Sequence, residues 1–237
     1  MNLFYDPLIN GQFYSLSQEE SKHISRVLRK KEGDTVYFTD GKGWFYETII
    51  TIANTKNCEV EILRKYEGTD NRPFRIHIAI APTKINDRFE WFLEKTTEIG
   101  IDEITPIICD HSERKVIKKE RLEKVITSAV KQSLKSHHPL LNGQISLKDF
   151  LNKEFTGQKF IAYIDKEITL ELSKVVKTKE DILVLIGPEG DFRPEEVEIA
   201  KENGFIPVSL GKSRLRTETA GIVACNTVNI INQIEGF

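Results

Sequence analysis

The chain has 237 residues, with 34 Lys and Arg against 36 Asp and Glu, and this near balance does not indicate a nucleic-acid binder from overall charge alone. Hydrophobic residues make up 39%, no apolar run is long enough to cross a bilayer, and the N-terminus lacks the pattern of a signal peptide, so we expect a cytoplasmic globular protein. The three cysteines, Cys58, Cys109 and Cys225, form no C-x-x-C pair and indicate neither a disulfide framework nor a zinc site.

The first 70 residues have mainly the patterns of short strands. Residues 35–39 and 44–50 flank Asp40-Gly41-Lys42-Gly43, which predicts a β-hairpin with a glycine-rich turn. Residues 58–63 alternate between apolar and polar side chains like a half-buried strand. We therefore expect a small β-rich domain.

One helix interrupts these strands. Ser17-Gln18-Glu19-Glu20 has the pattern of a capping box, which predicts a helix from this point to Gly33. Residues 22–31 contain five Lys and Arg and no acidic residue, and residues 111–138 contain eight Lys and Arg against three Glu. Such local density attracts polyphosphate, although for either run a solvated helix face is an equally good interpretation.

The polar residues 67–73 include Gly and Pro and are the best candidate for a domain boundary. We expect one domain in residues 1–70 and an α/β domain in residues 74–237. Continuous apolar runs alternate with helical patterns there, which predicts a parallel sheet with crossover helices. Strands are expected at 74–81, 104–109, 160–164, 182–186 and 206–210, and helices at 87–99, 121–135, 194–203 and 217–234.

Two glycine-bearing turns follow two of these strands and are the most informative feature of the chain. The first is Gly187-Pro188-Glu189-Gly190, and the second begins at Leu210-Gly211 and continues through Leu215-Arg216-Thr217-Glu218-Thr219-Ala220 into the last helix. Either turn alone is also compatible with a tight connection that binds nothing. Because ligands bind at the carboxyl ends of parallel strands, we expect the two turns to form walls of one pocket, at the ends of neighbouring strands.

The kind of ligand follows partly from what the turns lack. Neither the G-x-x-x-x-G-K-[ST] phosphate loop nor the G-x-G-x-x-G dinucleotide fingerprint occurs, and Gly41-Lys42-Gly43 lies in a hairpin. The pocket is therefore not expected to hold a pyrophosphate. An adenosine with a non-phosphate tail fits better.

These two turns resemble the signature of the SPOUT methyltransferases, and most closely that of the RsmE branch, which methylates N3 of a uridine in 16S ribosomal RNA. Residues 23–29 resemble that family's N-terminal RNA-contacting helix, and residues 95–101 and 112–114 resemble its middle motifs. The resemblance spans nearly the whole chain. It implies a PUA-like β-barrel followed by an α/β domain with a deep trefoil knot, which general topology rules do not predict. It also implies a homodimer that needs no metal.

By the same resemblance, S-adenosylmethionine is the cofactor. Its candidate binding residues lie in or beside the two turns: Leu185, Ile186, Gly187, Pro188, Glu189, Gly190, Leu210, Gly211, Leu215, Arg216, Thr219 and Ala220.

Catalysis by such an enzyme requires alignment of the uridine and removal of its imide proton. Arg216 is the candidate for stabilising negative charge on the uracil, and Glu189 or Glu218 for accepting the proton. An ion pair between Arg216 and one of these glutamates is the structural alternative. Candidate RNA contacts are the basic or imidazole side chains of His23, Arg26, Arg29, Lys30, Arg114 and Lys135.

The chain departs from the family pattern at a few positions. Asp191 stands where a further Gly is usual, Lys212-Ser213-Arg214 brings an extra Arg, and Lys135 replaces an Arg. Two rival functions stay open: another SPOUT specificity, such as ribose 2′-O-methylation or a tRNA target, and a non-catalytic RNA-binding assembly factor. Affinity for S-adenosylmethionine distinguishes the second rival from an enzyme.

Overall fold

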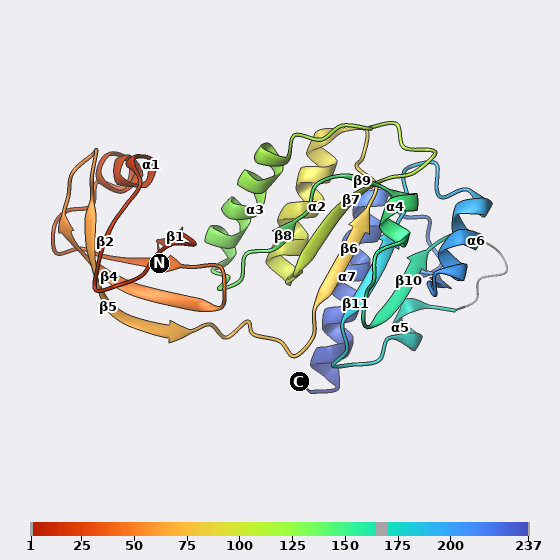
Figure 1. The fold of residues 1–237 in the computed structure, drawn as a ribbon. Coiled ribbons are helices and arrows are strands. Elements are labelled where there is room, and N and C mark those ends of the chain that lie inside the picture. Colours follow the sequence, from red (N-terminus) through yellow and green to blue (C-terminus); the bar gives the residue numbers. More distant parts are fainter. Residues whose placement is uncertain (1, 165–169, 237) are drawn as a thin grey trace. The chain divides into compact units, whose positions relative to one another are not determined.

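The computed structural model describes residues 2–164 and 170–236 and divides the chain into two compact units (Figure 1). The first consists of Met1–Asn71 with Val130–His138, and the second of Arg72–Ala129 with Pro139–Phe237. The first unit thus contains a short segment that was expected in the C-terminal domain. In the described residues, no helix is long and apolar enough to span a membrane.

The first unit is built on a five-stranded sheet. Its order is β1-β3-β4-β5-β2, with β1 parallel to β3 and every other pair antiparallel. The predicted hairpin is confirmed as β3 and β4. The Tyr14 hydroxyl on β2 lies 2.9 Å from Asp6 Oδ2, just after β1, so the two edges of the sheet approach each other. In the described residues no backbone pairing joins these edges, and the sheet is barrel-like without a closed ladder. The strands are β1 (Leu3–Tyr5), β2 (Phe13–Ser15), β3 (Thr35–Thr39), β4 (Trp44–Ile52) and β5 (Glu59–Glu67).

The helix of this unit is shorter than predicted. Ser17 caps α1 (Gln18–Lys22), its Oγ accepting the Glu20 N–H at 3.3 Å, and the π-helical turn η1 (His23–Val27) follows. The predicted end at Gly33 is wrong, because Arg29 has a left-handed φ of 53° that no helix continues through. Ile24 of η1 is fully buried in the core of the unit, so the turn is held by packing of its apolar side.

Hydrogen bonds explain why Val130–His138 belongs to the first unit. The Ser136 carbonyl accepts from Thr39 Oγ1 at 2.9 Å and from the Gly43 N–H at 3.0 Å. The Ser136 N–H and hydroxyl both donate to Asp70. Burial alone would raise the pKa of Asp70, but hydrogen bonds from His137 and Ser136 outweigh it and hold that pKa well below its usual range.

The second unit is an α/β unit with a wholly parallel sheet, as predicted. Its order is β12-β10-β11-β6-β7-β8. The short strand β9 also pairs with β7, at residues 107–108, whereas β8 pairs with residues 103–104 of the same strand. One expectation is wrong: β11 and β12, which precede the two glycine turns, are not neighbours, because β10 pairs with both of them. The strands are β6 (Ile76–Ile80), β7 (Glu103–Ile108), β8 (Leu140–Leu141), β9 (Ile145–Ser146), β10 (Gln158–Ala162), β11 (Ile182–Ile186) and β12 (Ile206–Val208).

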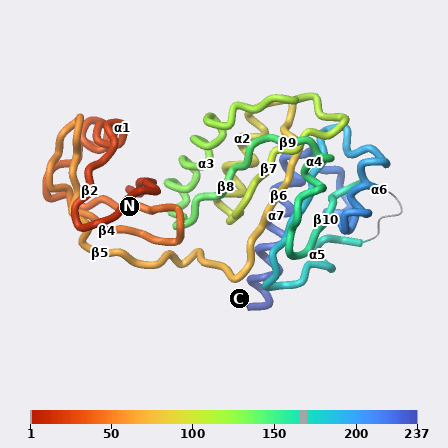
Figure 2. Tube along the Cα trace, viewed as in Figure 1, coloured from red at the N-terminus to blue at the C-terminus, as the bar shows by residue number. Residues whose placement is uncertain are grey.

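Helices cover both faces of this sheet (Figure 1). Phe150 of α4 and Val197 of α6 share a buried cluster with Leu183 and Leu185 of β11. On the other side α7 packs against α2, β6 and β11. Figure 2 shows the path of the chain as a tube, with α6 and α7 labelled in the last part of the chain. The helices are α2 (Asn86–Ile99), α3 (Lys119–Ser133), α4 (Leu147–Leu151), α5 (Leu172–Val175), α6 (Pro194–Glu202) and α7 (Thr217–Ile234), of which α3 has its last four residues in the first unit.

Gly221 sets how closely α7 approaches the sheet. A Cβ at this position would lie 2.6 Å from Cε2 of Phe92 in α2 and 3.0 Å from Cδ1 of Ile80 in β6. Any side chain here would push the helices apart. The first turn of α7 is therefore held beside the carboxyl end of β6 by the absence of a side chain.

His77 on β6 makes folding of this unit sensitive to pH. Its Nε2 lies 2.8 Å from Thr105 Oγ1, and its ring packs edge-on against Phe150. Burial lowers the pKa of His77 to about 4, and the opposing effect of the nearby Glu103 carboxylate is smaller. The neutral imidazole is therefore the form that the folded state prefers.

We expect this histidine to destabilise the fold as pH falls. Because the pKa of the folded state lies below the unfolded value of about 6.5, its contribution is complete above pH 6.5 and is lost between pH 6.5 and about 4. From pH 7 to pH 5 the free energy of unfolding is therefore expected to fall by about 2 kcal/mol through this residue. Urea denaturation at both pH values measures it, with His77→Leu as the comparison. An equal loss in that variant would assign the effect to other groups.

Candidate functional site

A cavity of about 810 Å³ opens at the carboxyl ends of β10, β11 and β12. Its walls are the two glycine turns, the residues that follow β10, and the first turn of α7. The volume lies within the range of small-molecule sites. The two turns do line one pocket, although the strand between them was not expected there.

Most of the predicted cofactor residues line this cavity. Leu185 instead packs in the core between the sheet and helices α4 and α6, Gly190 lies beside His111, and Thr219 is half-buried on α7. These three residues lie outside the lining. The predicted residues that line it are Ile186, Gly187, Pro188, Glu189, Leu210, Gly211, Leu215, Arg216 and Ala220.

The turn after β11 uses its glycines for close packing. A Cβ on Gly187 would lie 3.1 Å from the ring of Phe192, and one on Gly190 would lie 3.2 Å from Cβ of His111. The residue with a left-handed conformation is Asp191, at φ 61°, whose N–H donates to the Pro188 carbonyl at 3.0 Å. The turn therefore places a carboxylate, and not a glycine, at its strained position.

The turn after β12 presents backbone to the cavity. Gly211 has a φ of 117°, which only glycine adopts readily, and no atom lies within 4 Å of where its Cβ would be. Ser209 holds the turn, since its Oγ accepts the Gly211 N–H at 3.1 Å and donates to the Gly211 carbonyl at 2.9 Å. A ligand can approach the main chain here without meeting a side chain.

Glu189 lines the cavity and also braces a neighbouring loop. Its Oε1 accepts the Lys84 N–H at 2.9 Å, while its buried Oε2 has no hydrogen-bond partner among the described residues. Arg114 holds the same loop from the other side, donating to the carbonyls of Thr83 at 2.9 Å and Lys84 at 2.6 Å. The structure thus gives Arg114, a predicted RNA contact, a structural role in shaping the pocket.

Glu218 and Arg216 both lie at the start of α7, but their side chains differ in environment. Glu218 is 4% exposed, its Oε1 lies 3.8 Å from Arg88 Nε, and it does not line the cavity. Arg216 stands at the N-cap position of α7, makes no side-chain capping hydrogen bond, and is exposed. Among the ion pairs of the described residues, none joins Arg216 to either glutamate. The alternative reading of Arg216 as a loop-shaping ion pair is therefore not realised.

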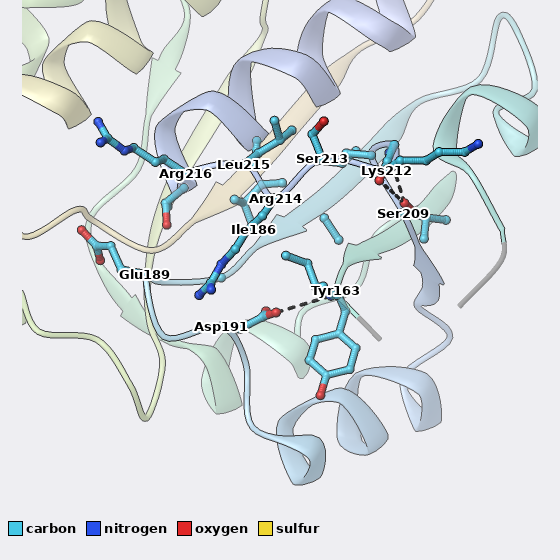
Figure 3. A pocket seen from close by; sticks show the side chains of 18 of the residues that line it. Tyr163, Ile186, Glu189, Asp191, Ser209, Lys212, Ser213, Arg214, Leu215 and Arg216 are labelled. Carbon is cyan, nitrogen blue, oxygen red and sulfur yellow. Dashed lines mark hydrogen bonds between the residues drawn. The ribbon is translucent and has the colours of Figure 1, made fainter. Parts of the chain in front are cut away.

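Figure 3 shows side chains in the cavity that the two sequence motifs do not predict, among them Tyr163, Asp191 and Arg214. Tyr163 and Ile164 follow β10 and form the wall between the two turns. Asp191 and Arg214, noted in the sequence only as departures from a family pattern, both line the cavity. The apolar run at 160–164 was the available signal for the first two, but the strand order that brings it here is not a local property.

The other predicted RNA contacts lie in the first unit. His23 Nδ1 lies 3.5 Å from Glu20 Oε2, and its ring packs edge-on against Phe4. Arg26 and Arg29 are exposed, whereas Lys30 and Lys135 are partly buried. Arg26 and Arg29 are therefore the members of this set whose charges are most accessible.

Two family descriptions match the chain: "RNA methyltransferase domain" at residues 70–229 and "RNA methyltransferase PUA domain" at residues 16–63. The ribosomal RNA small subunit methyltransferase E of Buchnera aphidicola subsp. Acyrthosiphon pisum is 30% identical over 92% of this chain and 88% of its own length.

Solved structures agree. A probable rRNA-methyltransferase from Porphyromonas gingivalis is 44% identical, with a TM-score of 0.92 over 100% of both chains. A ribosomal RNA small subunit methyltransferase E from Neisseria gonorrhoeae, bound to S-adenosyl methionine, is 29% identical, with a TM-score of 0.85 over 95% of both chains. The predicted resemblance is thus confirmed, and the chain belongs to the ribosomal RNA small subunit methyltransferase E family.

Proposed function

We propose that this protein transfers a methyl group from S-adenosylmethionine to N3 of a uridine in 16S ribosomal RNA. The observation that carries the proposal is the cavity built by the two motif turns at the carboxyl ends of β10, β11 and β12. The names of the relatives point to small-subunit ribosomal RNA, and one related structure contains the cofactor.

The residues of the cavity fit this cofactor. An adenosine with a charged tail needs apolar walls with a few polar groups, and Ile186, Pro188 and Leu215 supply apolar surface. Gly211 leaves its backbone open, and the unpartnered Oε2 of Glu189 is an acceptor that a polar ligand can satisfy. We assign the holding of the cofactor to these two turns.

The cofactor supplies an already activated methyl group, so the chain itself has to align the uracil and handle its charge and proton. The Arg216 guanidinium, exposed at the edge of the cavity, stabilises the negative charge that develops as N3 loses its proton. Glu189 is the better proton acceptor of the two candidates, because it lines the cavity. Glu218 is enclosed beside Arg88, and we assign it to positioning the first turn of α7.

We further propose that the second unit contains the trefoil knot. The path of the chain supports this: β12 lies at the sheet edge beside β10, yet α7, which begins shortly after it, packs against α2, β6 and β11. The connection has to pass the carboxyl ends of β10 and β11 to reach that position. A homodimer is also proposed, and Trp91 on α2 and Ile230 on α7, each 44% exposed, offer apolar surface for it.

We expect Arg26→Ala combined with Arg29→Ala to weaken RNA binding and to reduce its salt dependence. Both side chains are exposed in a run without acidic residues, and each phosphate contact contributes about 0.7 to the slope of log K against log salt for single-stranded RNA. The slope is therefore expected to fall by about 1.4. Fluorescence anisotropy across a salt series measures it.

The control is Lys56→Ala with Lys177→Ala, which removes the same charge from exposed positions outside this run. An unchanged slope in the Arg26/Arg29 variant, or an equal fall in the control, would contradict docking through these arginines.

The proposed reaction is tested by deleting the gene and mapping modified nucleotides in 16S RNA, followed by transfer to isolated small subunits in vitro. Loss of one N3-methyluridine, restored by the purified protein and S-adenosylmethionine, is the expected result. Loss of a ribose 2′-O-methyl group or of a tRNA modification would support a different specificity. Unchanged RNA together with no cofactor binding would support a non-catalytic RNA-binding factor.

A further inference from the structure

Asp191 and Arg214 bring opposite charges to one side of the cavity. Both line it, Asp191 from the turn after β11 and Arg214 from the turn after β12. Figure 3 shows the Arg214 side chain extending between Glu189 and Asp191. No ion pair within 4.0 Å joins the two side chains in the described part of the chain, so neither charge is neutralised by direct pairing with the other.

The Asp191 carboxylate is fixed in place by the backbone around it. Its Oδ1 accepts the Phe192 N–H at 2.8 Å, and its Oδ2 accepts the Ile164 N–H at 3.4 Å. Burial raises the pKa of this carboxyl group, while these hydrogen bonds and the charges of Arg214 and His111 act in the opposite direction. Asp191 is thus a partly desolvated anion on a rigid turn, which favours a cationic ligand group.

The backbone of Asp191 indicates that its side chain has a function. At φ 61° a glycine would be less strained than an aspartate, and the hydrogen bonds of the carboxylate go to N–H groups of two loop residues, Phe192 and Ile164, outside the helices and strands. Strained non-glycine residues cluster at ligand sites, where the side chain is needed despite the strain. Arg214 complements it, because it offers the planar donor fork that matches a carboxylate.

We propose that Asp191 and Arg214 form the subsite for the amino-acid end of the methyl donor. Asp191 accepts hydrogen bonds from the donor's α-ammonium group, and Arg214 donates to its α-carboxylate. This inference rests on the proposed function, since it names how that same site recognises S-adenosylmethionine. It assigns the tail to two residues of these turns that depart from the family pattern, and leaves the other residues of the turns to hold the rest of the cofactor.

Isothermal titration calorimetry with three compounds tests the assignment without any turnover. S-adenosylmethionine carries both tail charges, decarboxylated S-adenosylmethionine keeps only the ammonium, and 5′-methylthioadenosine has neither. Arg214→Met is expected to weaken binding of the first compound by about tenfold and to leave the other two unchanged. Asp191→Asn is expected to weaken the first two by about tenfold and to leave the third unchanged.

Two further variants complete the test. Lys148→Met removes the same charge from an exposed position on α4 that does not line the cavity, so all three affinities should stay within about twofold. Asp191→Gly should repeat the affinity pattern of Asp191→Asn without lowering the melting temperature, which separates lost recognition from a damaged fold.

The outcomes distinguish this inference from the function on which it rests. Absence of S-adenosylmethionine binding by the unchanged protein would overturn both. If the unchanged protein binds S-adenosylmethionine normally, and Arg214→Met lowers the affinity for all three compounds equally or for none of them, the subsite alone would be overturned. Weakened RNA binding with unchanged cofactor affinity in Arg214→Met would instead assign this arginine to an RNA phosphate and would also overturn it.

Discussion

Arg216→Ala is expected to reduce the rate of methyl transfer by about 10²- to 10³-fold, the loss typical of removing one group that stabilises developing charge. The reason is that Arg216 lines the cavity, is exposed, and forms no ion pair with Glu189 or Glu218. Its charge is therefore available to the substrate. Single-turnover transfer of a labelled methyl group to small subunits measures the rate, and calorimetry should show S-adenosylmethionine affinity within about threefold of the unchanged protein.

Arg193→Ala is the matched control for this variant. Arg193 stands at the N-cap of α6 as Arg216 stands at the N-cap of α7, and it is also exposed. It pairs with Asp110 at 3.3 Å and does not line the cavity, so its removal should leave the transfer rate unchanged. A rate for Arg216→Ala close to that of the control would remove Arg216 from the chemical step.

Arg72→Met should lower the free energy of unfolding by about 3 kcal/mol. The guanidinium of Arg72 joins three elements: Nη1 donates to the Gly100 carbonyl at 2.8 Å and to Asn229 Oδ1 at 2.7 Å, and Nη2 donates to Asp102 Oδ2 at 2.7 Å. The arginine side chain is 12% exposed and that of Asp102 is 20% exposed. Removing it leaves a largely buried carboxylate without its counter-charge, and it removes one of the hydrogen-bonded links between the end of α2 and α7, another being the bond that the Asn229 amide donates to the Gly100 carbonyl.

Urea denaturation monitored by circular dichroism measures this loss, and Arg75→Met is the control. Arg75 is three residues away, its side chain is 60% exposed, and its guanidinium lies 3.6 Å from Glu103. An exposed pair of this kind contributes little, so the control should unfold at the same urea concentration as the unchanged protein. Equal midpoints for the two variants would show that the Arg72 contacts do not stabilise the unit.

Local sequence patterns predicted those strands and turns that depend on a single property, such as a glycine-rich turn or a continuous apolar run. The hairpin of β3 and β4 followed from its glycine-rich turn, and the parallel strands followed from continuous apolar runs. The end of the first helix was not predictable in this way, because it depends on the left-handed backbone of Arg29 and on burial of Ile24. The helix propensities of the residues give neither of these properties.

The side chains of the site likewise divide into those whose position could be predicted from the sequence and those whose position could not. Gly187, Gly211 and Arg216 lie in the cavity because they belong to turns that end strands, and a turn after a strand is a feature of the sequence. Glu218 belongs to the same motif but lies beside Arg88, since the helical position of a residue, and what packs against it, decides which way it faces.

The sequence by itself determined the family, the alternation of strands and helices, and the two turns that line the pocket. Only the tertiary structure decided that β10 lies between those turns and adds Tyr163 and Ile164, and that Asp191 and Arg214 both line the cavity. It also decided that Arg114 braces the loop at Thr83 and Lys84. The physical reason is that a turn or a strand is specified by neighbouring residues, whereas strand order and side-chain pairing are contacts between residues far apart in the chain.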